Sequence, residues 1–277
     1  MNLLQALFLG IVQGLTEFLP VSSSGHLVLL QHVFGITEPE LLFDVCLHVG
    51  TLAAVVVALR REVAELFVGF GRSARFLALR LTGRAAGPFP WKDRSVRLFF
   101  LVVAGTLPTG ILGVLIQKTA KGVFASAPFA AAMLLVTGLV LLATRFTGKG
   151  EKKIAEMGAK EAVAIGLAQG VAVLPGISRS GSTIAAGLFL GVDRDTAARF
   201  SFVLSLPAIL GAVVLEAASG GGGGGAPPAA VMVGALSAGL TGYFALRFLI
   251  RIVSAGGLFW FSPYCFVIGT GALAWLV

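Results

Sequence analysis

Charged residues are scarce in this chain, and so is cysteine. Of the 277 residues only 12% are charged and 57% are hydrophobic, whereas a soluble domain carries about 25% charged residues. The two cysteines, Cys46 and Cys265, lie far apart in apolar runs, which excludes a cysteine metal site and predicts two small buried thiols. The composition excludes a soluble globular protein and a disordered chain. It predicts one membrane-embedded domain over residues 1–277.

Basic residues are absent before Arg60 and then gather in two segments. The net charge is +8, which in a soluble protein would suggest a nucleic-acid partner. Here the basic residues cluster in segments 60–96 and 145–160, as the charges that orient membrane spans do, so no nucleic-acid partner is expected. The same rule places both segments in the cytoplasm as loops. Residues 1–20 lack the basic start of a signal peptide and are expected to be retained.

Apolar runs long enough to cross a bilayer of about 30 Å are predicted to form six transmembrane helices. They cover 40–59, 97–117, 123–144, 198–218, 228–250 and 257–277. Two further regions, 2–36 and 161–192, are interrupted by proline and by polar residues, as re-entrant helical hairpins are. The predicted fold is therefore an all-α integral membrane protein with both termini outside, and the glycine run Gly220–Gly225 in an external loop.

The two interrupted regions resemble each other. Gly10, Gln13 and Gly14 recur 156 residues later as Gly166, Gln169 and Gly170, and Ser24-Gly25 recurs at the same offset as Ser180-Gly181. Each copy is followed by three spans, an odd number, so the second copy enters from the opposite side of the membrane. This predicts an inverted-topology repeat, with repeat one at 1–144, a cytoplasmic linker at 145–160 and repeat two at 161–277.

The first polar turn combines a carboxylate, hydroxyls and an imidazole. Its polar members are Gln13, Glu17, Ser22, Ser23, Ser24, Gly25 and His26. Gln13 and Glu17 are four residues apart, so their oxygens lie on one helix face and are candidate ligands for a divalent cation. The serines and Gly25 begin a half-helix whose free N–H groups attract anions, and His26 can transfer a proton near neutral pH. The alternative is a serine-rich helix cap, with Glu17 satisfied by a neighbouring helix.

The second polar turn places one arginine among hydroxyls and glycines. Its members are Ser178, Arg179, Ser180, Gly181 and Thr183. A guanidinium, hydroxyl donors and backbone N–H groups at a helix start are what a phosphate site needs. The alternative is a structural ion pair between Arg179 and Glu17 across the repeat interface.

Other ionisable groups and glycines carry weaker predictions. Asp44 and His48 share one helix face and either line the approach to the site or lie at the membrane interface, and Glu216 is expected to be solvated. Three glycines are expected to let helices approach closely: Gly105, Gly110 and Gly113.

Together the two turns resemble the bacterial undecaprenyl-pyrophosphate phosphatase family, the membrane enzymes associated with bacitracin resistance. Gln13-x-x-x-Glu17 with the following Ser23 and His26 is similar to the family's (Glu/Gln)-x-x-x-Glu motif, and Pro175 to Ser180 is similar to its Pro-Gly-x-Ser-Arg-Ser motif. Many members carry Glu at the position of Gln13, and Gln cannot act as a base. A two-carboxylate mechanism is therefore in doubt for this chain.

The resemblance implies hydrolysis of undecaprenyl diphosphate to undecaprenyl phosphate, which recycles the lipid carrier of cell-wall synthesis. It implies a divalent cation, Mg²⁺ or Ca²⁺, and a site open to the outer face of the bacterial cytoplasmic membrane. Carried over, the catalytic residues are Glu17, Ser23, His26 and Arg179; the substrate-binding residues are Ser22, Ser24, Gly25, Ser178, Ser180, Gly181 and Thr183; the metal ligands are Glu17 and Gln13. Attack by Ser23 and direct attack by water remain open.

A transporter is the rival interpretation, because secondary transporters are also built from inverted repeats with interrupted helices. Such a protein would carry an anion or flip a lipid phosphate, and it would need Arg179 but not the acid/base set. The oligomeric state, including a homodimer, stays open.

Overall fold

The computed structural model describes residues 1–33, 41–83, 87–124, 126–218 and 227–276, and within these ranges the chain is almost entirely helical. In chain order the α-helices are α1 Leu3–Phe18, α2 Ser23–Val33, α3 Leu41–Ala58, α4 Arg60–Leu81, α5 Arg94–Thr119, α6 Ala127–Ala143, α7 Ala159–Val171, α8 Arg179–Phe189, α9 Arg194–Ala218, α10 Pro228–Ser254 and α11 Ser262–Leu276. Three short 3₁₀ helices lie between them: η1 Lys121–Val123 after α5, η2 Thr144–Phe146 after α6 and η3 Leu258–Phe261 after α10. The prediction of an all-α protein is confirmed.

Long apolar helices occupy all six predicted spans. Five of them are long and apolar enough to cross a membrane, and the bent pair formed by α3 and α4 is a sixth candidate. The helices that match the predictions are α3, α5, α6, α9, α10 and α11. The chain is therefore a multi-pass integral membrane protein.

Each predicted hairpin consists of two short helices with a polar turn between them. Helix α1 ends at Phe18, and Leu19 is extended (φ −61°, ψ 142°), because a residue that precedes proline avoids the helical region. Ser22 then has a left-handed backbone with φ 66°. In the second turn Gly176 takes up φ 91°, a conformation that glycine adopts without a steric penalty.

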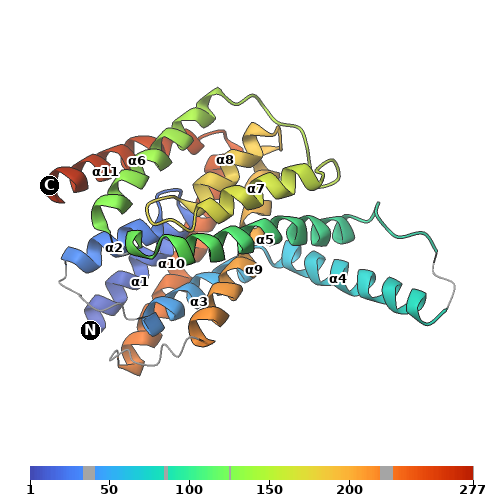
Figure 1. The fold of residues 1–277 in the computed structure, drawn as a ribbon, viewed down its shortest axis with the longest axis horizontal. Helices are drawn as coiled ribbons and strands as arrows, with labels where there is room; N and C mark the ends of the chain where they lie inside the picture. The colour runs from blue at the N-terminus through green and yellow to red at the C-terminus, as the bar shows by residue number, and fades with distance from the viewer. Residues whose placement is uncertain (34–40, 84–86, 125, 219–226, 277) are drawn as a thin grey trace.

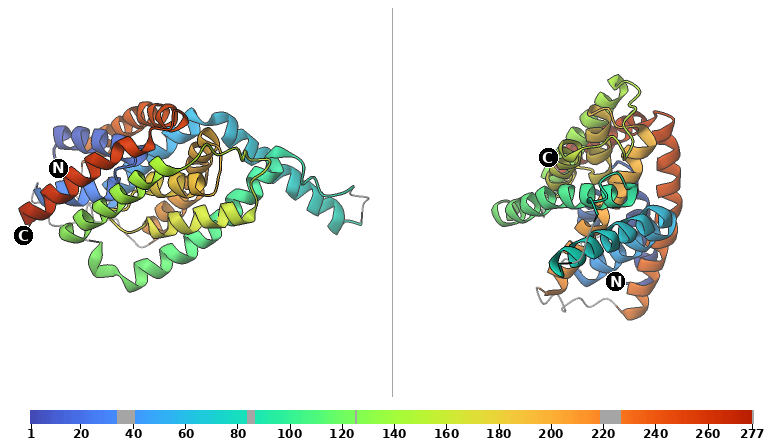
Figure 2. Two further views of the ribbon diagram at one scale, coloured as in Figure 1. Left: turned by 90° about the horizontal axis from the view of Figure 1, so that it is seen from above. Right: turned by 90° about the vertical axis from the view of Figure 1, so that its right-hand side faces the viewer.

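Helices from each half of the chain pack on helices from the other half. Helix α1 packs mainly on α10, whereas its counterpart α7 packs mainly on α5, and α6 packs on α11. Figures 1 and 2 show the start of α1 and the end of α11 at one end of the molecule and the far end of α4 at the other. This reciprocal packing brings the α1–α2 turn to the α7–α8 turn in the interior.

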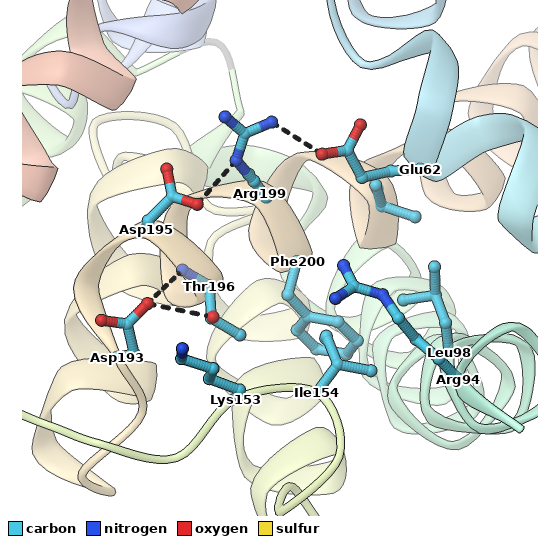
Figure 3. A pocket seen from close by; sticks show the side chains of 11 residues that line it. Glu62, Arg94, Leu98, Lys153, Ile154, Asp193, Asp195, Thr196, Arg199 and Phe200 are labelled. Atoms are coloured by element: carbon cyan, nitrogen blue, oxygen red, sulfur yellow. Dashed lines mark hydrogen bonds and ion pairs between the residues drawn. The ribbon is translucent and has the colours of Figure 1, made fainter. Parts of the chain in front are cut away.

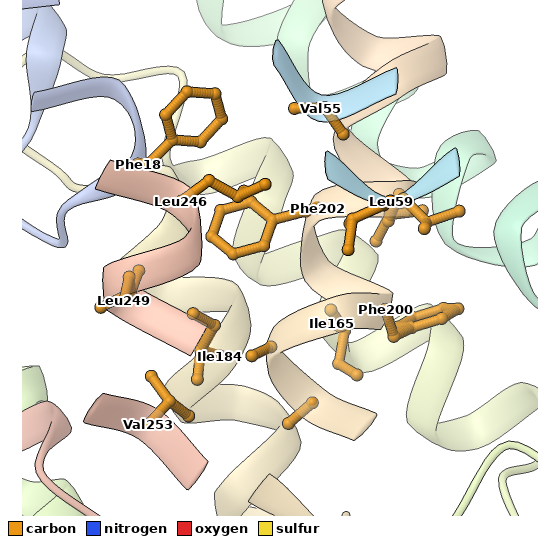
Figure 4. Close-up of a cluster of buried hydrophobic side chains, with 14 of the residues drawn as sticks. Phe18, Val55, Leu59, Ile165, Ile184, Phe200, Phe202, Leu246, Leu249 and Val253 are labelled. Carbon is orange, nitrogen blue, oxygen red and sulfur yellow. The ribbon is translucent and has the colours of Figure 1, made fainter. Parts of the chain in front are cut away.

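A core of buried apolar side chains lies behind the turns (Figure 4). Phe18, which follows Glu17, is 1% exposed and meets Phe202 of α9 edge to face, with 5.7 Å between ring centroids. Leu246 of α10 and Ile184 of α8 belong to the same cluster. Burial of Phe18 therefore anchors the end of α1 and, with it, the position of Glu17.

The prediction of a loop over 60–96 was wrong for its first part, because residues 60–81 form α4. This helix is bent by 87° from α3, and it packs on α5, where a Cβ at Gly69 would stand 2.1 Å from the Ser95 carbonyl oxygen. Apolar residues alternate with arginines along the segment at helical spacing. Counting its arginines as loop charge concealed that periodicity.

Several smaller predictions are corrected by the packing. Among the three glycines, Gly105 makes a close helix contact, but a Cβ on Gly110 would meet nothing within 4 Å and one on Gly113 would make an ordinary contact of 3.6 Å. Cys265 is buried as predicted, whereas Cys46 is only partly buried. The side chain of Glu216 and the run Gly220–Gly225 lie outside the described residues.

Candidate active site

An ion pair across the repeat interface joins the two polar turns. Arg179, the first residue of α8, pairs through an amino group with Oε1 of Glu17 in the last turn of α1. The Glu17 side chain is 3% exposed and that of Arg179 is 22% exposed. A buried carboxylate requires such a partner, because an unpaired charge in a low-dielectric interior is costly. The ion pair that the sequence offered as a structural alternative is therefore present. It also brings the carboxylate of the first turn to the guanidinium of the second turn.

The second oxygen of Glu17 accepts hydrogen bonds from its own repeat. The Ser23 hydroxyl donates to Oε2 over 2.6 Å and the Gln13 amide donates to it over 2.9 Å. Ser23 begins α2, so the interrupted hairpin turns this hydroxyl back onto the helix that precedes it. The arrangement places a hydroxyl oxygen against a carboxylate that can accept its proton.

Gln13 links Glu17 to His48 of α3. Its Nε2 also lies 3.2 Å from Nδ1 of His48, which stands 3.7 Å from Oε2 of Glu17. Glu17 and His48 therefore accept the two amide hydrogens of Gln13. The buried Oε1 of Gln13 has no hydrogen-bond partner within the described ranges. Sequence reasoning left His48 either on the approach to the site or at the membrane interface. Its contact with α1 depends on how α3 packs, which spacing does not report.

At the start of α2 the backbone comes close to the opposite polar turn. Ser22 caps the helix by accepting from the Gly25 N–H over 3.3 Å, and Ser24 is exposed with its hydroxyl 3.4 Å from that of Ser22. A Cβ at Gly25 would stand 3.1 Å from the Cα of Gly176 in the opposite turn. The two half-helices thus begin beside each other, where first-turn N–H groups attract an anion.

Hydroxyls of the second turn are engaged in holding it together. Ser178 caps α8 by accepting from the Gly181 N–H over 3.1 Å, and Ser180 donates to the Leu19 carbonyl over 3.4 Å. Thr183 donates to the Arg179 carbonyl over 2.7 Å and is 1% exposed. In this structure these side chains position Arg179, and their direct contact with a substrate stays a prediction.

Thr137 of α6 is a residue that sequence reasoning missed. Its hydroxyl donates to the Gly176 carbonyl over 2.8 Å and accepts from the Ser178 N–H over 3.0 Å. A threonine in an apolar span gives no signal of this role, because the contact depends on α6 packing beside the second turn.

His26 points away from the Glu17 cluster. Its Nδ1 lies 2.8 Å from the Ser22 carbonyl oxygen, and its Nε2 lies 2.8 Å from the hydroxyl of Tyr264 in α11. The structure therefore brings Ser23 to Glu17 rather than to His26. Tyr264 was also missed, since an aromatic residue in a terminal span is most simply interpreted as lipid-facing.

A separate polar pocket of about 410 Å³ opens among α4, α5, the linker and α9 (Figure 3). Its Arg199 donates to Glu62 over 2.6 Å and to Asp195 over 2.8 Å. None of the turn residues lines it. The ion pair between Arg199 and Glu62 ties α4 to α9 at this pocket.

Known proteins match the chain over almost its whole length. Residues 6–271 match the family described as "Bacitracin resistance protein BacA". A protein of Desulfatibacillum aliphaticivorans named undecaprenyl-diphosphatase is 48% identical over 274 residues, covering 99% of this chain and 98% of its own. Proteins with the same name from Desulfosudis oleivorans and Methanobrevibacter smithii are 49% and 40% identical, and they cover 100% and 97% of this chain and 99% and 96% of their own.

Proposed function

The chain belongs to the bacitracin resistance protein BacA family, and we propose that it hydrolyses undecaprenyl diphosphate to undecaprenyl phosphate and inorganic phosphate. Relatives that are 48% and 49% identical over nearly full length carry the name undecaprenyl-diphosphatase. The reaction returns the lipid carrier to cell-wall synthesis. A membrane-embedded enzyme suits this substrate, because its long prenyl chain remains in the bilayer while the diphosphate reaches the polar turns.

The contacts of Glu17 are the observation that carries this proposal. One buried carboxylate joins the Ser23 hydroxyl, over 2.6 Å, to the Arg179 guanidinium of the opposite turn. An anion carrier would use the arginine but would have no need of a hydroxyl held against a base. The pairing of an activated hydroxyl with an anion-binding cation therefore favours phosphoryl transfer over transport.

In the proposed reaction Ser23 is the nucleophile and Glu17 is its base. The Ser23 oxygen attacks the terminal phosphorus, its proton passes to Oε2 of Glu17, and the bond from that phosphorus to the bridging oxygen breaks. Undecaprenyl phosphate leaves with the electron pair of that bond. Water then attacks the phosphorus of the phosphoserine, and the bond from that phosphorus to the Ser23 oxygen breaks. Glu17 returns its proton to the Ser23 oxygen, and inorganic phosphate is released.

Arg179 and the two half-helix starts are proposed to hold the diphosphate. Only one amino group of Arg179 contacts Glu17, so the remaining N–H groups of the planar guanidinium are available to phosphate oxygens. The starts of α2 and α8 also lie near each other, since a Cβ at Gly25 would stand 3.1 Å from the Cα of Gly176 just before α8, and helix starts attract anions. Phosphoryl transfer depends mainly on such positioning and charge stabilisation.

A divalent cation, Mg²⁺ or Ca²⁺, fits the residues of the first turn. The buried Oε1 of Gln13 has no hydrogen-bond partner in the described part of the chain, and Glu17 lies on the same face of α1. Oxygen donors of this kind suit a hard cation that completes its coordination with substrate oxygens. Gln13 and Glu17 would hold the ion, which would neutralise charge on the diphosphate when bound.

We place the protein in the bacterial cytoplasmic membrane with the site open to the outer face. The basic segments around α4 and the linker are proposed to face the cytoplasm, as the distribution of arginine and lysine favours. The helix ends at the N- and C-termini lie at the opposite end of the molecule from α4 (Figure 1). Both termini would then be external.

Phosphate release by the detergent-purified protein tests the proposed function. Undecaprenyl diphosphate is supplied with Mg²⁺ or Ca²⁺, and again with a chelator. We expect cation-dependent release that falls by at least about 100-fold in Ser23→Ala and Glu17→Gln, since the proton acceptor and its hydroxyl are removed. Ser73→Ala, whose hydroxyl bonds within α4, is the matched control and should keep full activity. No release from folded wild-type protein would favour the transporter.

A further inference from the structure

The imidazole of His26 is held at both of its nitrogens. Its Nδ1 lies 2.8 Å from the Ser22 carbonyl oxygen and its Nε2 lies 2.8 Å from the Tyr264 hydroxyl. A carbonyl oxygen accepts but cannot donate, so Nδ1 carries a hydrogen. In a neutral ring Nε2 is then the acceptor, and the Tyr264 hydroxyl donates to it.

The surroundings favour the neutral ring over the imidazolium. A nearby carboxylate would favour the charged imidazole, but Glu17, the carboxylate of the first turn, is already paired with Arg179. Helix α6, which packs on both α2 and α11, carries no ionisable side chain between Ala127 and Ala143. Cys265, the neighbour of Tyr264, is a thiol.

Helix α11 is anchored so that Tyr264 meets His26 in one orientation. The buried Cys265 has its sulfur 3.7 Å from the Pro20 carbonyl oxygen of the first turn. The rings of Tyr264 and His26 are nearly parallel, at 13°, with centroids 5.7 Å apart. The contact therefore joins the last helix of the chain to the turn that carries Ser23.

We propose that Tyr264 is a positioning residue for His26. Together with the Ser22 carbonyl, its hydroxyl holds the imidazole with the hydrogen on Nδ1 and with the acceptor nitrogen Nε2 on the α11 side. This role rests on the proposed phosphatase function, in which His26 is an acid/base candidate three residues from Ser23. Tyr264 does not touch the reacting atoms. The Ser22 carbonyl keeps the hydrogen on Nδ1, and the Tyr264 hydroxyl orients Nε2, the nitrogen that is able to accept a proton during turnover.

Nitrogen NMR of the full chain, labelled with ¹⁵N-histidine in detergent, tests the tautomer directly. The chain has three histidines, and His26→Gln identifies the signals of His26. We expect a protonated Nδ1 and a hydrogen-bonded, unprotonated Nε2 in the wild type. Tyr264→Phe keeps the ring and removes the donor, so its His26 Nε2 signal should move away from the hydrogen-bonded value.

Tyr243→Phe is the matched control, because Tyr243 is the other tyrosine of the chain and its hydroxyl accepts from Arg247 on α10. It should leave the His26 signals unchanged. Turnover should fall about 3- to 10-fold in Tyr264→Phe, which is the expected effect of one lost neutral hydrogen bond, and should be unaffected in Tyr243→Phe. A merely structural role for Tyr264 would lower thermal stability without changing the Nε2 signal of His26.

Unchanged His26 nitrogen signals in folded Tyr264→Phe would overturn the proposal, as would a protonated Nε2 in the wild type. If Tyr264→Phe fails to fold, incorporation of 3-fluorotyrosine replaces it as the test. The fluorinated phenol is a stronger donor with the same ring, so the Nε2 signal should move further towards the hydrogen-bonded value, and no movement would contradict the proposal. Wild-type protein that releases no phosphate would refute the proposed function, whereas the nitrogen signals would still decide the role of Tyr264.

Discussion

Glu17 is the residue on which the candidate site depends, because side chains from both halves of the chain converge on it. Arg179 contacts one carboxylate oxygen, while Ser23 and Gln13 donate to the other. Each contact limits where the carboxylate can point. A buried charge with satisfied partners is rigid, and rigid placement of a base beside its hydroxyl is what the proposed reaction requires.

Replacement of Arg179 by alanine should abolish most phosphate release. The variant loses the cation proposed for the diphosphate and leaves Glu17 buried without its partner, so we expect a loss of about 100-fold or more in turnover. Arg75→Ala, an exposed arginine of α4, is the matched control. Normal activity of folded Arg179→Ala would show that this turn does not bind the phosphate.

Replacement of Gln13 by glutamate tests the proposed cation ligands. Gln13 now donates to Glu17 over 2.9 Å, and a carboxylate at that position would repel Glu17 unless a cation lies between them. We expect the Mg²⁺ concentration for half-maximal phosphate release to fall by about 3- to 10-fold. Activity in chelator should also be lower than that of the wild type.

The control for this change is Gln117→Glu at an exposed position of α5. It adds the same charge outside the site and should leave the cation requirement as it is. An unaltered requirement in Gln13→Glu would take Gln13 out of the ligand set.

At the scale of elements, the half-helices form because proline and serine interrupt apolar helices at defined points. Leu19 is extended before Pro20, and Ser22 and Ser178 cap the helices that follow by accepting from Gly25 and Gly181. These are local effects, and the sequence predicted the two interruptions themselves. The packing of α7 against α5 is different, since it depends on two segments that lie far apart in the chain.

Gly166 lies at a close backbone contact between α7 and α5. A Cβ there would stand 2.1 Å from the Gly105 carbonyl oxygen, whereas one at Gly110, also on α5, would meet nothing within 4 Å. Gly166→Ala should therefore separate α7 from α5 and destabilise the fold by about 1–3 kcal/mol. Gly110→Ala should be neutral or slightly stabilising, because alanine favours a helix over glycine.

Thermal unfolding in detergent measures both variants. We expect a lower midpoint for Gly166→Ala alone. Equal midpoints would mean that α7 and α5 can adjust to the added methyl group.

At the scale of the whole molecule, reciprocal packing of the two halves creates the site. Helix α1 lies on α10 and α7 lies on α5, so neither polar turn is completed by its own half. Glu17 comes from one half and Arg179 from the other. This packing brings the two half-helix starts together in the interior, where a single polar turn without the other would be left unsatisfied.

Labelling of single cysteines tests the proposed orientation. In a chain with Cys46→Ala and Cys265→Ala, a cysteine is introduced at Leu3 or at Arg75, both of which are exposed. An impermeant maleimide should react with the Leu3 position in intact cells and with the Arg75 position only after permeabilisation. The reverse pattern would invert the topology and place the basic segments outside.

By itself the sequence determined the membrane class, the spans, the two interrupted hairpins and the polar residues of both turns. Each of these follows from local composition, since apolar length, proline and serine act on their own neighbourhoods. The tertiary structure alone decided that Ser23 faces Glu17 rather than His26, that His48 reaches Gln13, and that Tyr264 meets His26. Spacing along one helix cannot report such contacts, because they depend on how separate helices rotate and pack against one another.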